Sequence, residues 1–345
     1  MDHEPPRMAG ILLPVFSARH ASDYGIGDTR SLGQWIEWAA QHSVGFIQLL
    51  PIHEHGSDES PYSAISSAAI DPIFLALDAS GIPWLDAADF ARFEAQAEQL
   101  RGNPRVDYPA VRTVKRRVLE LAWSRFASAP EPLQREWREF REKEADWLED
   151  YTLFRFFMER FGPQLGWHEW PEECRTVKGA RRQLAALIKS EGDAVSGRLG
   201  FHAMVQWLCH RQWSEVHALA DRLGVQLMGD MPIGVAHHSC DVFFNREQFD
   251  LDWFGGSPAE GHQADNPFMC QWGQNWGIPL YRWDRMEADG CRWWRQRIQQ
   301  LQRFFHIFRI DHILGFYRMY GFPWHPQDNP RFIHRSHEEV AAMTG

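Results

Sequence analysis

The sequence predicts an α/β protein built around a parallel sheet, either open or closed into a barrel. Two observations predict this class. Four short apolar runs end in polar or proline-containing turns, as buried parallel strands do. Helical stretches separate or precede these runs, and a repeated order of helix and strand is typical of parallel sheets.

The predicted strands cover residues 11–16, 46–52, 225–233 and 305–313. Between the first two we expect a helix over residues 31–45, with Trp35, Trp38 and Ala39 on its apolar side. A long helix over residues 199–223 precedes the third strand and ends at Gly224. A further helix over residues 291–304 precedes the fourth strand.

The segment between strands two and three differs in character. Residues 85–195 are rich in charged residues and helical patterns, including one long helix near residues 131–160. Such a segment is too long for a simple connection and indicates an inserted subdomain. We therefore expect three parts: residues 1–84 with strands one and two and the site rim, the insertion 85–198, and residues 199–345 with strands three and four.

The composition excludes several classes of protein. The 345 residues carry a formal net charge of −10 and contain no block of Lys or Arg. The composition therefore argues against nucleic acid or an anionic membrane as the main partner. The sequence contains no run of about 18 apolar residues, so it predicts no membrane span. The first ten residues lack an apolar signal core. Five scattered cysteines without a CxxC pair indicate reduced thiols, so we expect a soluble cytoplasmic protein.

The segment Arg309-Ile310-Asp311-His312 carries the clearest chemical signal. Side chains alternate along a strand, so Arg309 and Asp311 share a face at the strand's C-terminal end, where barrel enzymes place their chemistry. An aspartate beside a fixed guanidinium stays ionised, as a nucleophile or electrostatic stabiliser must. A structural ion pair is the alternative interpretation.

Other candidates follow the neighbouring strands. Asp230 ends the third strand, and together with Asp311 it would line a carboxylate cleft of the kind used in glycoside chemistry. Tyr62, in Ser-Pro-Tyr after the second strand, could stack on a sugar. Gln274 and Trp276 lie in a glycine-flanked segment that could fold over a polyhydroxylated ligand. The alternatives are a capping aspartate, an ordinary turn and a glycine-rich loop.

Seven motifs, in order, resemble the amylomaltases (4-α-glucanotransferases) of glycoside hydrolase family 77: ILLPVFS with GIGD, LLP, SPY, GDMPIGV, GQNWGIPLYRW and RIDHILGF. This resemblance implies a (β/α)8 TIM barrel of the α-amylase type with helical insertions. It implies retaining transfer of α-1,4-glucan segments between maltodextrins and glucose, without a cofactor. It makes Asp311 the covalent nucleophile and Arg309 its orienting partner, with Asp230, Tyr62, Gln274, Trp276 and His312 lining the sugar subsites.

Retaining chemistry also requires a carboxylic acid about 5 Å from the nucleophile. The resemblance implies a glutamate at the end of the next barrel strand, but the only carboxylates after Asp311 are Asp328, Glu338 and Glu339. We therefore expect the chain to be the N-terminal part of the barrel, with about four strands and the acid beyond Gly345. The alternatives are a non-catalytic maltodextrin-binding remnant, an α-glucan hydrolase, and half of a barrel completed by a separate chain.

Two histidine-rich segments could suggest a metal site. His53-Glu54-His55 and His237-His238 lack the three or four ligands at defined spacing that zinc requires. The sequence therefore predicts no metal.

Overall fold

The computed structural model describes residues 7–56, 59–259 and 265–344. Its strands are β1 Gly10–Leu12, β2 Phe46–Gln48, β3 Gln226–Met231, β4 Phe249–Ser257, β5 Gln274–Tyr281, β6 Ile307–Ile310 and β7 Tyr320–Phe322. Its α-helices are α1 Thr29–Gln41, α2 Ala87–Arg101, α3 Tyr108–Ser124, α4 Glu131–Lys143, α5 Ala145–Phe161, α6 Val177–Glu191, α7 Asp193–Leu223, α8 Cys240–Phe244, α9 Pro267–Trp272, α10 Trp283–Ala288, α11 Arg292–Leu301 and α12 His337–Thr344.

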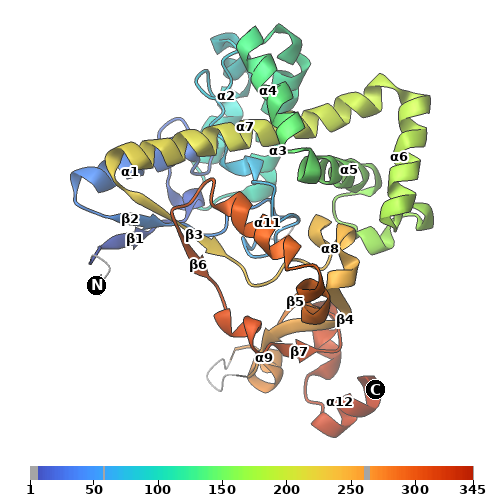
Figure 1. The fold of residues 1–345 in the computed structure, drawn as a ribbon. Helices are drawn as coiled ribbons and strands as arrows, with labels where there is room; N and C mark the ends of the chain where they lie inside the picture. Colours follow the sequence, from blue (N-terminus) through green and yellow to red (C-terminus); the bar gives the residue numbers. More distant parts are fainter. Residues whose placement is uncertain (1–6, 57–58, 260–264, 345) are drawn as a thin grey trace.

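Strands β1, β2, β3 and β6 form a parallel sheet in that order (Figure 1). Each strand overlaps one of the four predicted apolar runs, so the predicted parallel α/β class is confirmed. Within the described residues this sheet is open, with β1 and β6 at its edges. The C-terminal ends of all four strands lie along one edge of the sheet, because parallel strands run the same way.

Helix α1 connects β1 to β2 as predicted, but its buried face differs. Leu32, Ile36 and Ala39 are fully buried, whereas the Trp38 side chain is 39% exposed and stacks on His42. The prediction that Trp38 lies on the buried side is wrong. Helix α7 packs beside α1.

Helix α7 fixes the loop that follows β2. It spans the top of the sheet in Figure 1 and ends, as predicted, at Gly224, whose φ of +68° is the left-handed conformation that glycine favours. Gln206 forms two hydrogen bonds of 2.9 Å with the backbone N–H and C=O of Ile70. Gln212 forms the same pair of 2.9 Å bonds with Ala76. These amides hold the loop backbone as a neighbouring strand would.

The insertion between β2 and α7 consists of helices α2 to α6. The single helix predicted near residues 131–160 is wrong, because the chain breaks at Glu144 into α4 and α5. Glu144 is 3% exposed, and its carboxylate pairs with Arg303 at 2.6 Å and accepts from Trp147 Nε1 at 2.8 Å. This buried ion pair with a distant segment positions Glu144 between the two helices.

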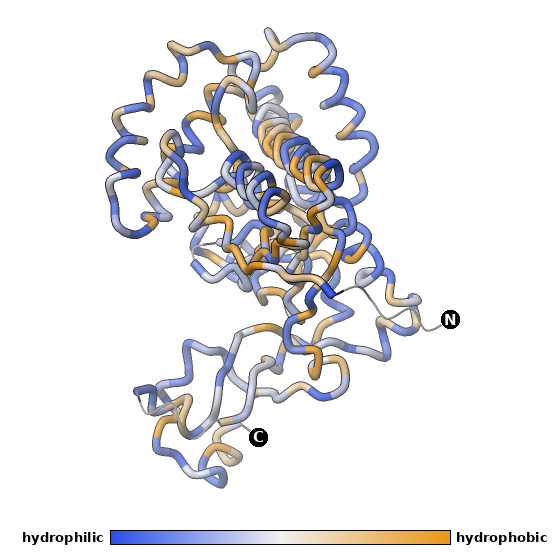
Figure 2. The backbone as a smooth tube through the Cα atoms, turned by 90° about the vertical axis from the view of Figure 1, so that its left-hand side faces the viewer, coloured by the Kyte–Doolittle hydropathy of each residue, from blue (hydrophilic) through white to orange (hydrophobic). Residues whose placement is uncertain are grey.

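A second sheet, antiparallel with the order β5-β4-β7, was not predicted. It forms a smaller lobe with α9 and α12, at the bottom of both views (Figures 1 and 2). A separate apolar cluster stabilises this lobe, composed of Phe268, Trp272, Phe322, Trp324, Phe332 and Val340. Gln274 and Trp276, which the sequence analysis placed in a glycine-flanked loop, lie instead at the start of strand β5.

Two general expectations can be compared with the structure. All five cysteines carry free thiols, and three of them are buried, as predicted. Among the described helices, none combines the length and the apolar character needed to cross a bilayer.

Candidate active site

Four predicted residues meet at the C-terminal edge of the parallel sheet: Tyr62, Asp230, Arg309 and Asp311. Asp230 on β3 and Arg309 on β6 are direct partners in the strand register. Asp311 lies just beyond β6, and its backbone N–H continues the pairing by donating to Met231 O at 3.0 Å. Strand alternation therefore places the side chains of Asp230, Arg309 and Asp311 on the same face.

Arg309 links the two carboxylates. Its Nη1 donates to Asp230 Oδ2 and its Nη2 donates to Asp311 Oδ1, both at 2.6 Å. The planar fork of arginine presents two donor groups in a fixed geometry that suits this double contact, whereas the single nitrogen of a lysine ammonium offers no such fork. Burial disfavours the charge of Arg309, but the carboxylates of Asp230 and Asp311 outweigh it and raise its pKa.

The two aspartates differ in exposure. The Asp230 side chain has no exposed surface, whereas that of Asp311 is 36% exposed. Asp230 Oδ2 also accepts from the Tyr62 hydroxyl at 2.7 Å. Burial raises the pKa of Asp230 although both hydrogen bonds oppose this, and burial together with Asp230 raises the pKa of Tyr62 to about 12. Asp311 is therefore the carboxylate that an incoming ligand can reach.

The remaining predicted residues lie on the other side of Asp311. The Trp276 and His312 rings meet edge to face, with centroids 4.8 Å apart. Trp276 Nε1 donates to Gln274 Oε1 at 3.0 Å. His312 has a φ of +48°, a left-handed conformation that is unfavourable for residues with a Cβ atom. These contacts, together with the chain adjacency of Asp311 and His312, connect all seven predicted residues into one set, the Asp311 row, although Trp276 is partly buried rather than exposed.

An apolar surface follows Asp311. In the short helix η7 (Ile313–Phe316) and the residue after it, Ile313 is 50% exposed, Leu314 64% and Tyr317 88%. Exposed apolar groups beside a reactive carboxylate can exclude water once a ligand covers them.

The His53-Glu54-His55 segment belongs to a buried network instead of a metal site. The Glu54 carboxylate accepts from the Tyr151 hydroxyl and pairs with Arg155 at 3.4 Å. His55 Nε2 lies 3.3 Å from Asp71, which also pairs with Arg112. These contacts attach the loop after β2 to helices α3 and α5. Glu54, His55, Arg112, Tyr151 and Arg155 also line a cavity of about 410 Å³, which lies between that loop and helices α3, α5 and α7, separate from the Asp311 row.

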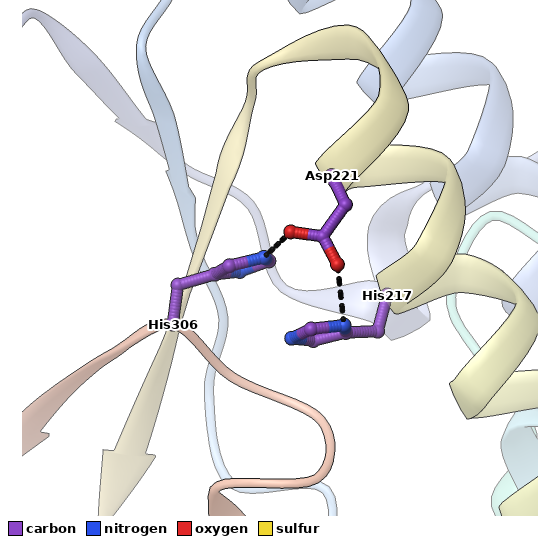
Figure 3. A group of neighbouring side chains, drawn as sticks. All are labelled: His217, Asp221 and His306. Carbon is purple, nitrogen blue, oxygen red and sulfur yellow. Dashed lines mark hydrogen bonds and ion pairs between the residues drawn. The ribbon is translucent and has the colours of Figure 1, made fainter.

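His217, Asp221 and His306 are the only group of described residues whose ligand atoms are close enough to suggest a metal site (Figure 3). The two imidazole rings are stacked, 4.1 Å apart and 6° from parallel. Metal bonds lie in the plane of an imidazole ring, so two stacked rings do not converge on one ion. His306 Nδ1 also accepts from Leu227 N–H at 2.9 Å, so Nε2 carries the proton donated to Asp221. This cluster fastens α7 to the start of β6.

Comparison with known proteins addresses the family. A family model described as 4-alpha-glucanotransferase, glycoside hydrolase family 77, matches residues 13–344. The chain belongs to this family. It is 34% identical to the 4-alpha-glucanotransferase of Thermus thermophilus over 324 residues, which cover 93% of the chain and 61% of that relative. It is 31% identical to the Chlamydia caviae protein of the same name, covering 94% of the chain and 57% of the relative.

Solved structures of the family agree with the fold. An amylomaltase from Streptococcus agalactiae, in complex with acarbose, superposes with a TM-score of 0.78 at 27% identity, covering 92% of this chain and 61% of that one. The Corynebacterium glutamicum amylomaltase shares the fold with a TM-score of 0.73 at 21% identity, covering 92% and 42%. The chain therefore spans between 42% and 61% of the length of these four family members.

The sequence did not predict how the glucanotransferase-family site is supported. Strand β4, which pairs with the β5 strand that carries Gln274 and Trp276, could have been found from the alternation in residues 249–253, where Phe249, Leu251 and Trp253 are separated by aspartates. The pairing of Arg309 with Asp230 required the register of β3 against β6, which no local pattern gives.

Proposed function

We propose that this chain carries the nucleophile side of a 4-α-glucanotransferase site. The enzyme would transfer α-1,4-glucan segments between maltodextrins and glucose with retention, through a covalent bond to Asp311. One observation carries the proposal: Arg309 holds the exposed Asp311 beside the buried Asp230 at adjacent parallel strand ends. Family membership supports the same assignment.

The reaction would proceed in two displacements. An Asp311 carboxylate oxygen attacks the anomeric carbon of the donor, the bond to the leaving sugar breaks, and an acid protonates the leaving oxygen. An acceptor sugar hydroxyl then attacks the same carbon, loses its proton to the conjugate base, and releases Asp311. Arg309 orients Asp311 in both steps, while Tyr62 binds the sugar at the donor side and the buried Asp230 holds the Tyr62 hydroxyl.

Asp230 does not fit the role of the acid. Its Oδ2 accepts from both Tyr62 and Arg309, so a proton would sit on Oδ1, which has no exposed surface and no partner among the described residues. Asp328 pairs with Arg331, and Glu339 caps α12 through Ser336. We therefore propose that the acid is a glutamate at the end of the next strand of a (β/α)8 barrel, as the resemblance to the amylomaltases implies.

Transfer is favoured over hydrolysis by the surroundings of Asp311. The Trp276–His312 ring pair and the exposed Ile313, Leu314 and Tyr317 would place an acceptor sugar against apolar surface and exclude water. We also propose that the reaction needs neither a cofactor nor a metal, and that the protein binds neither nucleic acid nor a membrane. A cytoplasmic location is proposed from the free cysteines.

Incubation of the full-length protein, which would include the strand expected to carry the acid, with maltotriose tests the function. We expect glucose together with maltodextrins longer than maltotriose, and no product from Asp311→Asn. Glucose and maltose without longer chains would indicate a hydrolase. Maltotriose binding without any product in the wild type would indicate a binding remnant.

A further inference from the structure

The turn after β3 is held by two side chains from outside the parallel sheet. Arg297 of α11 donates through Nη2 to the Pro232 carbonyl at 2.7 Å. Tyr281, the last residue of β5, donates through its hydroxyl to the Ile233 carbonyl at 2.6 Å. Two consecutive carbonyls of the turn that follows Asp230 are therefore each fixed by a separate donor.

Arg297 is an unusual residue for the interior of a protein. It is 4% exposed, and its guanidinium lies over the Trp293 and Trp294 rings at 5.3 and 5.1 Å. Within the described part of the chain it forms no ion pair, and its Nε and Nη1 have no hydrogen-bond partner. Burying an unpaired guanidinium is destabilising, whereas an apolar residue would fill the same space without that cost. The hydrogen bond from Nη2 to the Pro232 carbonyl offsets part of the cost of burying this charge.

The turn has little freedom between these two donors. A Cβ atom at Gly234 would lie 2.3 Å from the Ile278 side chain of β5, so only glycine fits where the turn passes β5. Strand β3 ends at Met231, and Asp230 is the residue before it. Any shift of the Pro232 and Ile233 carbonyls therefore moves the end of β3 that carries Asp230.

We propose that Arg297 and Tyr281 are positioning residues, which fix the turn at Pro232 and Ile233 so that Asp230 meets both Tyr62 and Arg309. The contact with Arg309 extends the effect to Asp311. This inference rests on the proposed function for its effect on catalysis, but the position of Asp230 can be measured without any activity.

The experiment uses the Tyr62 ring as a reporter of Asp230. The protein is labelled with tyrosine carrying ¹³C at Cζ, and the Tyr62 signal is assigned with Tyr62→Phe. The Asp230→Ala variant gives the chemical shift of Tyr62 without its hydrogen bond. The test variants are Arg297→Met, which keeps the volume but removes the donors, Arg297→Lys, which restores one donor, and Tyr281→Phe, which removes a single oxygen.

Tyr24→Phe is the matched control, because it also removes the hydroxyl of a buried tyrosine, one that lies between β1 and α1 and outside the loop that carries Tyr62. We expect Arg297→Met and Tyr281→Phe to move the Tyr62 signal toward its position in Asp230→Ala. We expect Arg297→Lys to restore it in part, and Tyr24→Phe to leave it unchanged. With maltotriose, kcat should fall about 10- to 100-fold in the first two variants with a smaller change in KM, as for misplaced catalytic groups.

A wild-type Tyr62 signal in both Arg297→Met and Tyr281→Phe overturns the inference, whatever the activities are. If Arg297→Met does not fold, Tyr281→Phe decides alone. If the wild type itself does not convert maltotriose, the proposed function fails, while the Tyr62 signals still decide whether the two residues position Asp230.

Discussion

Arg309 acts on two carboxylates in different surroundings. Asp230 is buried and held by a second donor, Tyr62, whereas Asp311 is exposed and has Arg309 as its side-chain partner. The same guanidinium therefore completes a buried contact on one side and orients the exposed carboxylate that we propose as the nucleophile on the other. A residue with two donor groups in one rigid plane suits this double contact.

Replacement of Arg309 by lysine tests this double role. A lysine lacks the planar fork that holds both aspartates, so we expect kcat/KM for maltotriose to fall about 10- to 100-fold. The Arg309 side chain is 41% exposed, so the free energy of unfolding should change by no more than about 1 kcal/mol. Arg331→Lys, at the exposed pair with Asp328, is the control and should keep full activity. Wild-type kinetics in Arg309→Lys would contradict the assigned role.

At the scale of elements, α7 determines where the loop carrying Tyr62 lies. Its two buried glutamines satisfy the backbone of Ile70 and Ala76, so the loop needs no neighbouring strand. The ion pairs of Asp71 and Glu54 attach the same loop to α3 and α5. We propose that the insertion, residues 85–198, serves to hold this rim of the site.

Removal of the Gln206 amide should loosen that attachment. Gln206→Leu leaves the buried N–H of Ile70 without its partner and leaves its C=O with only the weak Cys209 thiol donor at 3.8 Å, so we expect a loss of about 2–4 kcal/mol in the free energy of unfolding, measured by urea denaturation. Gln296→Leu, at an exposed position of α11, is the matched control and should change it by less than about 0.5 kcal/mol. Equal effects of the two substitutions would show that the Gln206 amide contributes nothing specific.

His210 makes the packing of α7 sensitive to acid. Its ring stacks on Trp147 and meets Phe140 and Phe304 edge to face, and burial lowers its pKa to about 3. The unfolded chain binds a proton near pH 6.5, which the folded chain does not. The stability associated with His210 is therefore fully present above pH 6.5 and is lost progressively as the pH falls toward 3.

We expect His210→Phe to reduce this loss. Relative to the wild type, the variant should gain on the order of 1–2 kcal/mol of unfolding free energy on going from pH 7 to pH 5. Thermal unfolding of both proteins across this range measures the difference. Parallel stability curves for the two proteins would show that folded His210 titrates like an exposed histidine.

At the scale of the whole molecule, the elements that the sequence predicted are those with a local cause. The four parallel strands are continuous apolar runs, and α7 ends at a glycine in the left-handed conformation. The break at Glu144 was missed because it depends on Arg303, far away in the chain. The second sheet was missed because β4 and β5 contain bulges and glycines that interrupt their alternation.

The contacts of the candidate site also divide into those with a local cause in the sequence and those without one. Arg309 and Asp311 could be paired from strand alternation alone, and the structure confirms their contact at 2.6 Å. Asp230 and Tyr62 were predicted as neighbours of the site but not as partners of each other, because their bond joins strand β3 to the loop that follows β2. The roles of Arg297 and Tyr281 depend on contacts with a turn that no motif includes.

The central claim is that Asp311 forms a covalent bond to the sugar, and α-maltotriosyl fluoride tests it most directly. Fluoride leaves without a proton, so the first displacement needs Asp311 but not the acid. After a rapid acid quench and peptic digestion, mass spectrometry should find a maltotriosyl group on the peptide containing Asp311, and none in Asp311→Asn. An adduct on another carboxylate, or fluoride release that is unchanged in Asp311→Asn, would contradict the account.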